Sequence, residues 1–244
     1  MGSWGEIAAE YREFRPGYPA DLFASLAALP ANRRLAWDCG TGNGQAARGL
    51  AAHFDRVVAT DASPQQLQQA LPSRNVEYLV APAESCPLPD DCADLVVVAQ
   101  ALHWFDLDRF YAEVHRVGRP GSILAATCYY EPSVNPAVDA VLARYQETVR
   151  SYWPAGREWV DAGYRTIPFP FEELPMDRRQ LSLDTDLPRF LGYLNTWSAS
   201  RAFKKATGRD PLEPFSAAFA DAWGAPTRTV TWHFNVRLGK IRPA

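Results

Sequence analysis

The stretch that most restricts the fold of this sequence is LAWDCGTGNG, at residues 35–44. An apolar run ends there in an acid, three alternate glycines follow, and residues 45–52 have a helical pattern. This order predicts a strand, a tight loop and the start of a helix. Glycines allow positive φ and let a ligand approach the backbone, and the first turn of a helix presents unpaired N–H groups. We therefore expect a nucleotide-like cofactor at this loop.

The glycine spacing by itself fits two kinds of cofactor. Residues 42–47 also match the G-x-G-x-x-G/A pattern of dinucleotide-binding proteins. A pyrophosphate is anionic, however, and the loop contains Asp38 but neither Lys nor Arg, so that the two would repel each other. A cofactor with a cationic amine and a sulfonium fits this charge better. A nicotinamide-dependent oxidoreductase is kept as the alternative.

Strand and helix patterns alternate through the first half of the chain. The expected strands begin at Leu35 and then cover residues 56–61, 76–80, 94–99 and 122–129. The fourth is rich in Val, as in a parallel strand that is covered on both faces. Such alternation predicts a doubly wound, Rossmann-like sheet.

Beyond residue 130 this rhythm stops. Strands are expected at residues 176–184 and around residues 230–238, where apolar and polar side chains alternate. Helical patterns cover residues 138–152, 187–206, with a break near Ser198, and 212–223. The predicted fold class is α/β: a seven-stranded doubly wound sheet, mostly parallel with an antiparallel last strand, plus helical cap insertions.

We expect a single domain over residues 1–244, because no Gly/Ser linker, charge block or repeat divides the chain. An alternative for the N-terminal segment is that it only covers the sheet, although its arginines and tyrosines suit a lid over a ligand. The expected parts are N-terminal lid helices at residues 1–30, a cofactor-binding core at 31–130, cap helices and a late strand at 131–225, and a final edge strand at 226–244.

Charge and cysteine content exclude several classes of partner. The net charge is -3 and the pI about 5.8, with Lys and Arg scattered, so we expect neither a nucleic acid nor a membrane surface as partner. The longest apolar run, residues 95–99, is too short to span a bilayer. The four cysteines show no C-x-x-C pair and no metal-ligand spacing. We expect reduced thiols, a cytoplasmic location, no metal, and a small-molecule substrate without an obligate protein partner.

A second acid, Asp61, ends the second expected strand, 21 residues beyond Gly40. In an open parallel sheet the ends of successive strands line one crevice, where an acid can accept hydrogen bonds from a ribose diol. The alternative interpretation of Asp61 is an N-cap for a helix over residues 63–71.

The order of these motifs resembles that of the class I S-adenosylmethionine-dependent methyltransferases. In that family a first motif like residues 38–44 holds the methionine portion of the cofactor, and an acid at the position of Asp61 binds the ribose. Residues 83–84 match the third-strand motif that contacts adenine, and Gln100 lies at the fourth strand end beside the methionine moiety. The resemblance therefore implies S-adenosylmethionine as the cofactor. The cofactor-binding residues it implies are Tyr11, Arg15, Asp38, Gly40, Thr41, Gly42, Gly44, Asp61, Ala62, Gln66, Ala83, Glu84 and Gln100.

A closer resemblance is to small-molecule enzymes of the trans-aconitate methyltransferase type. It rests on three segments, residues 11–19, 100–106 and 193–199. The chain departs from the family at Cys39, where Gly-Cys-Gly is more usual before the loop, and at Gln66, where Met is frequent. The leading hypothesis is methylation of an oxygen, first of all a carboxylate, with nitrogen or carbon acceptors left open. A cofactor-binding module that has lost catalysis is a further hypothesis.

Methyl transfer from a sulfonium is an in-line displacement, in which the protein mainly aligns the donor and the acceptor. A carboxylate with a pKa of about 4 needs no base, whereas a phenol with a pKa of about 10 would gain from one. His103 is the candidate base, and the alternative is a structural imidazole against Trp104. Arginines are the candidate partners of an acidic substrate. The expected substrate contacts are Tyr18, His103, Trp104, Trp153 and Trp197, and the candidate arginines are Arg15, Arg150, Arg157 and Arg165.

Overall fold

The computed structural model describes residues 14–19 and 21–242 of the chain, without the side chains of residues 176 and 177. The contacts of this part of the chain divide it into two compact units. The sheet unit contains Gly17–Tyr130, Trp159–Arg179 and residues 234–242, and the helical unit contains residues 14–16, Glu131–Glu158 and Gln180–His233. The predicted cofactor-binding core, residues 31–130, therefore belongs to the sheet unit.

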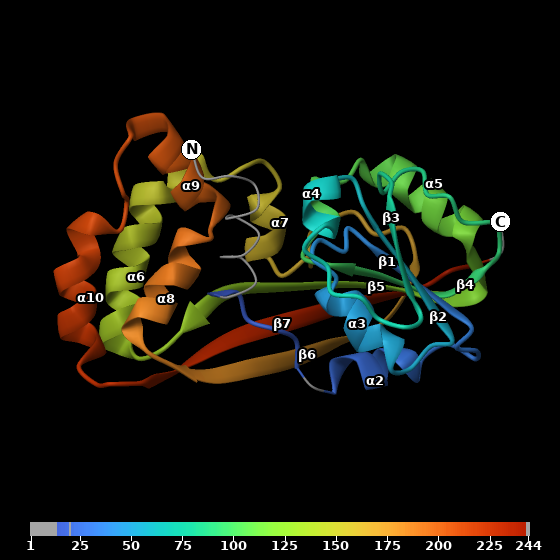
Figure 1. Cartoon of the computed structure of the whole chain (residues 1–244), viewed down its shortest axis with the longest axis horizontal. Helices are drawn as coiled ribbons and strands as arrows, with labels where there is room; N and C mark the ends of the chain where they lie inside the picture. Colours follow the sequence, from blue (N-terminus) through green and yellow to red (C-terminus); the bar gives the residue numbers. More distant parts are fainter. Residues whose placement is uncertain (1–13, 20, 243–244) are drawn as a thin grey trace. The chain divides into compact units, whose positions relative to one another are not determined.

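Seven strands form one sheet, as predicted, and their order is β3-β2-β1-β4-β5-β7-β6 (Figure 1). The pairs β3–β2, β2–β1, β1–β4 and β4–β5 are all parallel. This order places β1 and β4 next to each other at the point where the direction of winding reverses. The strands are β1 (Leu35–Cys39), β2 (Arg56–Asp61), β3 (Val76–Val80), β4 (Ala93–Ala99), β5 (Gly118–Ser133), β6 (Glu172–Thr185) and β7 (Arg228–Lys240).

The C-terminal strands run antiparallel to their neighbours. The N–H of Gly121 in β5 donates to the carbonyl of Ile241, and the N–H of Ile241 donates to the carbonyl of Ser122, each at 2.8 Å. Side-chain hydrogen bonds join β6 to β7 in three successive pairs. From one pair to the next, the residue number rises by two on β6 and falls by two on β7, which is the register of antiparallel strands. These pairs are Gln180–His233, Ser182–Thr231 and Asp184–Thr229. The mostly parallel sheet with an antiparallel last strand is therefore confirmed.

The last strand does not form the edge of the sheet, so the expectation of a final edge strand at residues 226–244 is wrong. Strand β7 lies between β5 and β6, and β6 forms the edge. The strict apolar–polar alternation of residues 230–238 indicated a strand with one solvated face. In the structure residues 234–239 are all buried, including Asn235 and Arg237, whose polar groups bond within the protein. Because these hydrogen bonds satisfy the polar groups of Asn235 and Arg237, both side chains can be buried in a strand that lies inside the sheet. Sequence spacing does not show these hydrogen bonds.

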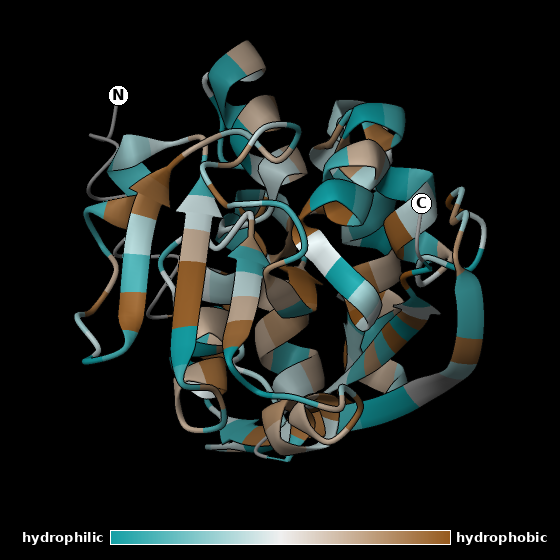
Figure 2. Ribbon diagram, turned by 90° about the vertical axis from the view of Figure 1, so that its right-hand side faces the viewer, coloured by the Kyte–Doolittle hydropathy of each residue, from teal (hydrophilic) through white to brown (hydrophobic). Residues whose placement is uncertain are grey.

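Alternate residues of the parallel strands face two separate apolar cores. Ala36, Val57 and Val97 belong to the core under α2 (Leu22–Ala27) and α3 (Gln45–Ala51). Their neighbours in sequence, such as Trp37, Val58 and Val96, belong to the core under α5 (Leu107–Val117). Figure 1 shows α2 and α3 on one side of these strands and α5 on the other, and in Figure 2 hydrophobic residues run along the strands. Both faces are thus covered, as a parallel sheet requires.

The helix predicted over residues 63–71 is much shorter than expected. It is the single turn α4 (Pro64–Leu67), and none of its residues is buried. Ser63 caps it by accepting from the N–H of Gln66 at 3.3 Å. Without an apolar face against the sheet, a helix of this length has little to stabilise further turns.

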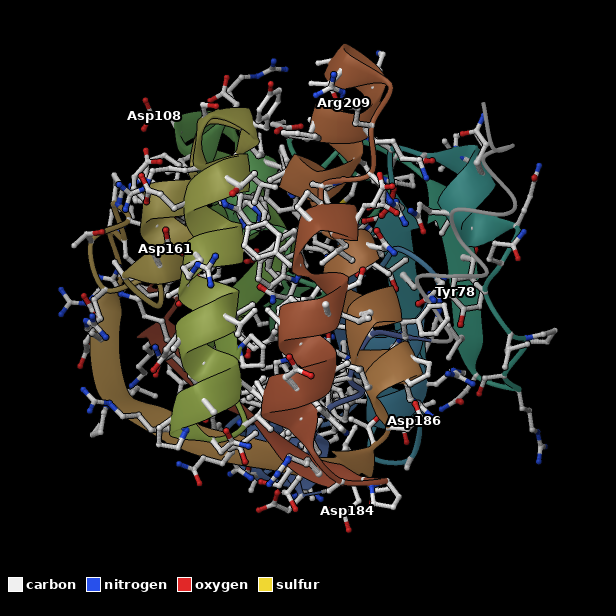
Figure 3. All side chains as sticks on the ribbon, turned by 90° about the vertical axis from the view of Figure 1, so that its left-hand side faces the viewer. Tyr78, Asp108, Asp161, Asp184, Asp186 and Arg209 are labelled. Carbon is white, nitrogen blue, oxygen red and sulfur yellow. The ribbon has the colours of Figure 1, made fainter. Side chains whose placement is uncertain are left out.

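The helical unit gathers the helices between β5 and β7. The break predicted near Ser198 is confirmed, because one helix ends at Asn195 and the next begins at Ser198. Asp186, labelled in Figure 3, caps α8 by accepting from the N–H of Arg189 at 2.9 Å. The helices are α6 (Pro136–Val149), η2 (Arg150–Tyr152), α8 (Leu187–Asn195), α9 (Ser198–Thr207), η3 (Glu213–Phe215) and α10 (Ser216–Trp223).

Candidate functional site

The carboxyl ends of β1 to β4 meet at an open cleft in the sheet unit. Its volume is about 300 Å³. This is the edge at which doubly wound sheets bind their ligands. The cleft is lined by Gly40, Asp61, Ala62, Ala81, Pro82, Ala83, Glu84, Ala101, Trp104 and Phe105.

The glycine loop follows β1 and has three left-handed glycines, with φ of 70° at Gly40, 56° at Gly42 and 80° at Gly44. A Cβ at Gly40 would lie 2.7 Å from the Cβ of Ala101, and one at Gly44 would lie 2.5 Å from the hydroxyl of Tyr78. A Cβ at Gly42 would meet only a side-chain oxygen at 3.9 Å. Neighbouring residues therefore require glycine at the two outer positions, whereas the backbone of Gly42 remains open to approach.

Asp38 is fully buried at the end of β1. Its Oδ2 accepts from the hydroxyl of Thr41 at 2.5 Å, whereas its Oδ1 is buried without a hydrogen-bond partner among the described residues. Burial raises the pKa of Asp38 from 3.8 to about 7, against the opposing hydrogen bonds from Thr41 and the backbone of Ala47. The strand that leads into the glycine loop thus ends in an acid that is half protonated near neutral pH.

Asp61 connects the end of β2 to the glycine loop. Its Oδ2 accepts from the N–H of Gly42, and its Oδ1 accepts from the N–H of Ser63, each at 2.8 Å. Ser63, and not Asp61, caps α4, so the N-cap interpretation of Asp61 is wrong. Asp61 is half-buried and lines the cleft, where its remaining lone pairs can accept further hydrogen bonds.

Gln100, at the end of β4, has the left-handed φ of 59°. Its Nε2 donates to the carbonyl of Tyr129 at 2.8 Å, and its Oε1 is buried without a partner in the described part of the chain. A non-glycine residue with positive φ carries backbone strain, and such strain gathers at functional sites. Asp38 and Gln100 therefore each supply a buried acceptor oxygen, at the ends of adjacent strands.

Ala83 and Glu84, which follow β3, lie together on the wall of the cleft. Glu84 Oε1 accepts from the N–H of Asp106 at 3.0 Å, which ties this wall to the segment before α5. Gln66 is half-buried on α4, facing the space beside Gly42.

His103 lies in the short helix η1 (Leu102–Trp104), next to the cleft residue Trp104. Its ring centroid is 4.9 Å from that of Trp104, which is 57% exposed. The Nδ1 of His103 lies 2.7 Å from the hydroxyl of Tyr164. His103 thus packs on Trp104, as the structural interpretation predicts, and is also hydrogen-bonded through one ring nitrogen.

Other predicted site residues are not among those that line this cleft. Arg15 belongs to the helical unit, where its Nε donates to Thr196 Oγ1 at 2.8 Å. Trp153 and Trp197 pack together in the same unit, with ring centroids 5.5 Å apart. Tyr18 belongs to the sheet unit and makes edge-to-face contacts with the rings of Phe23 and Phe234. Tyr11 lies outside the described residues.

Sequence reasoning missed five residues at or beside the cleft. Ala81 and Pro82 directly precede the recognised pair of residues 83–84, so continuing the motif towards the strand end would have found them. Ala101 and Phe105 fall inside the segment of residues 100–106, but only the structure shows them against Gly40. Tyr164 had no sequence signal, because 61 residues separate it from His103.

No group of three or more His, Cys, Asp or Glu residues within the described chain is arranged to hold a metal ion. All four cysteines are free thiols. None of the helices that the structure describes is long and apolar enough to cross a membrane.

Comparison with known proteins narrows the kind of enzyme. A family model described as a methyltransferase domain matches residues 37–126. A protein of Dictyostelium discoideum, provisionally named a methyltransferase, is 33% identical over 225 residues, which cover 90% of this chain and 86% of that protein. An uncharacterized methyltransferase of Mycobacterium tuberculosis is 40% identical over 125 residues, 50% of each chain. A solved structure from Anaeromyxobacter dehalogenans, provisionally named a type II methyltransferase, has a TM-score of 0.87 and 46% identity, over 95% of this chain and 100% of that chain.

The doubly wound sheet, the glycine loop and the acids at successive strand ends define a Rossmann-like enzyme with a nucleotide-like cofactor. The similarities make the class specific: the chain belongs to the class I S-adenosylmethionine-dependent methyltransferases. It is a transferase, and its cofactor is S-adenosylmethionine. The oxidoreductase alternative is therefore set aside.

The buried Asp38 gives a pH dependence of stability. Its pKa is about 7 in the folded protein and 3.8 in its ordinary state, so the folded state binds the proton more tightly. The free energy of unfolding of the unliganded protein should therefore fall as the pH rises from about 4 to about 7 and then level off, by roughly 4 kcal/mol in total. Urea unfolding of the wild type and of Asp38→Asn between pH 5 and pH 8 measures this. Asp38→Asn should lack the decrease, and parallel curves would contradict the account.

Proposed function

We propose that this enzyme methylates a carboxylate oxygen of a small molecule, with S-adenosylmethionine held by the cleft residues. The observation that carries the choice of a carboxylate is the scarcity of bases. Among the residues that line the described cleft only Asp61 and Glu84 are titratable, and both already accept hydrogen bonds from backbone N–H groups. An acceptor that is already an anion at neutral pH needs no further base.

The residues of the cleft fit the cofactor. The buried Oδ1 of Asp38 and Oε1 of Gln100 have no hydrogen-bond partner among the described residues, and a cationic α-amine could donate to such oxygens. Gly42 leaves its backbone open, and a side chain there would fill that space. When bound, S-adenosylmethionine supplies a methyl group on a positively charged sulfur, which is already activated for displacement.

We assign the remaining parts of the cofactor to other residues of the cleft and to their neighbours. We assign the ribose hydroxyls to Asp61, which lines the cleft and also anchors Gly42. Ala62 and Gln66 would lie beside the adenine on one side, and Ala83 and Glu84 on the other. Thr41 orients Asp38 through its hydroxyl. Gly40 and Gly44 keep the loop close to its neighbours, because a Cβ at either would collide with them.

The chain's part in the reaction is alignment and exclusion of water. The acceptor oxygen supplies the electron pair of the new bond to carbon, and the pair of the old carbon–sulfur bond stays on sulfur. No proton is removed from a carboxylate in this step. We propose Trp104 and His103 as acceptor contacts beside the cleft, and retain Tyr18, Trp153 and Trp197 as further candidates.

The finer relationship to the trans-aconitate methyltransferase type is also a proposal. Its support is the resemblance of residues 11–19, 100–106 and 193–199 to the segments of those enzymes. Residues 100–106 include three residues of the described cleft, Ala101, Trp104 and Phe105. A substrate that carries carboxylates is consistent with this relationship.

The role of Asp61 can be tested by cofactor affinity. Asp61→Ala removes the proposed ribose acceptor and the anchor of Gly42, and should weaken binding of S-adenosylhomocysteine by about 10- to 100-fold. Isothermal titration calorimetry measures the affinity. The control is Asp55→Ala, an exposed acid at the opposite end of β2, which should bind as the wild type does. Unchanged affinity in Asp61→Ala would mean that the ribose lies elsewhere.

The acceptor class can be tested with S-adenosylmethionine that carries a labelled methyl group. The panel should contain di- and tricarboxylic acids, phenols and amines of similar size. We expect label in base-labile methyl esters of one or more acids. Transfer only to phenols or amines would contradict the carboxylate proposal. Tight binding of the donor without transfer to any acceptor would instead favour a module that has lost catalysis.

A further inference from the structure

Tyr164 stands out among the buried residues that the proposed reaction does not yet use. It lies in the turn after α7 (Arg157–Asp161), is fully buried, and has a φ of 59°. A bulky aromatic residue in the left-handed region carries backbone strain. Such a conformation persists only where the surroundings hold it in place.

Arg237 of β7 holds the backbone of this turn. Its guanidinium donates to the carbonyl of Tyr164 at 2.8 Å and to the carbonyl of Ile167 at 2.6 Å. The same guanidinium forms two hydrogen bonds with Glu173, at 3.0 Å and 2.6 Å. Arg237 is itself buried, and its ion pair with Glu173 is bidentate. The buried, ion-paired guanidinium of Arg237 therefore holds the strained turn in place.

The side chain of Tyr164 ends at His103. Its hydroxyl oxygen lies 2.7 Å from the Nδ1 of His103. The backbone N–H groups of Leu102 and His103, at the start of η1, also act on this phenol and lower its pKa, against the larger effect of burial. These amides open a short helix and have no acceptor within it. Within the described residues, the Nδ1 of His103 is therefore the hydrogen-bond partner that the geometry gives this hydroxyl.

These contacts decide which group donates in the pair of Tyr164 and His103. Burial raises the pKa of Tyr164 well above its ordinary value, so the phenol keeps its proton at neutral pH. A buried O–H needs an acceptor, and within the described residues the acceptor in reach is the Nδ1 of His103, at 2.7 Å, so the O–H points at it. A neutral imidazole that accepts at Nδ1 carries its proton on Nε2.

We propose that Tyr164 is a positioning residue for methyl transfer: its hydroxyl donates to the Nδ1 of His103 and so keeps the imidazole proton on Nε2. His103 then presents a hydrogen-bond donor, and not a base, to the methyl acceptor. The inference rests on the proposed function in one respect, the place of His103 beside the acceptor.

This arrangement selects for an anionic acceptor. A carboxylate oxygen accepts from the Nε2–H while another lone pair forms the bond to the methyl carbon, and the proton remains on the imidazole throughout. A phenol or an alcohol would have to lose its own proton, and a nitrogen that already carries one cannot take it. With its hydrogen bond from Tyr164, His103 therefore acts as a donor that orients carboxylates and not as the base that its sequence position suggested.

The tautomer of His103 can be measured directly by ¹⁵N NMR of the imidazole nitrogens in the unliganded protein. We expect the Nε2–H tautomer in the wild type and a shift towards the Nδ1–H tautomer in Tyr164→Phe. The matched control is Tyr111→Phe, which removes another buried phenol hydroxyl, one that donates to the carbonyl of Pro168 at 2.6 Å. The control should leave the His103 signals unchanged.

Turnover provides the second readout. With a carboxylic acceptor, Tyr164→Phe should lower kcat by about tenfold through the misplaced imidazole, with unchanged affinity for S-adenosylhomocysteine. His103→Asn, which keeps an N–H donor without a base, should retain more activity than His103→Ala.

The outcomes separate the two proposals. An Nδ1–H tautomer in the wild type, or wild-type His103 signals in Tyr164→Phe, would overturn the role of Tyr164. Should Tyr164→Phe fail to fold, the wild-type tautomer and the comparison of His103→Asn with His103→Ala still decide, since equal loss in both variants would contradict a donor. The NMR experiment contains no acceptor, so its result does not depend on the acceptor panel, which tests the proposed function.

Discussion

The proposed site depends on one buried carboxylate, Asp38, whose Oδ2 accepts from the hydroxyl of Thr41 and whose Oδ1 meets no partner in the described chain. A buried charge without compensation is costly, and its pKa of about 7 is the sign of that cost. For folding alone, an amide or an apolar residue at this position would stabilise the protein better. A ligand with a cationic amine is the simplest physical reason to keep an acid there.

The fold places this acid in β1, two residues before the cleft residue Gly40. Parallel pairing of β1 with β2 and β4 brings the carboxyl ends of these strands to one edge of the sheet. Asp38, Asp61 and Gln100 lie at or next to the carboxyl ends of these three neighbouring strands. The glycine loop then packs against Ala101 and Tyr78, and the N–H of Gly42 is held by Asp61. In the proposed site, backbone geometry thus fixes the residues assigned to the cofactor. On the acceptor side we propose side chains such as His103, whose tautomer we assign to the hydrogen bond from Tyr164. Backbone contacts suit a cofactor that many enzymes of the family use, and side-chain contacts suit the recognition of one particular substrate.

Much of the sheet unit could be predicted from the sequence, since its signals are local. Strands β2 and β3 begin and end at the predicted residues, and residues 38–44 form the loop that the glycine spacing indicates. Three features could not be predicted, because they depend on residues distant in sequence. Strand β7 is interior because Arg237 finds Glu173, Tyr164 reaches His103 across 61 residues, and Asp38 loses its solvent only once the strands pair. The spacing of residues along the sequence does not predict such long-range contacts.

The most direct test of the central claim, that Asp38 recognises the cofactor's cationic amine, is the number of protons exchanged on binding. Calorimetric titration of S-adenosylhomocysteine at pH 6.5, in buffers of different ionisation enthalpy, gives this number. Asp38 is mostly protonated in the free protein at that pH, given its pKa of about 7, and a cationic partner would stabilise its ionised form. The account predicts release of roughly half to one proton per ligand in the wild type and none in Asp38→Asn. Equal proton exchange in the two proteins would contradict it.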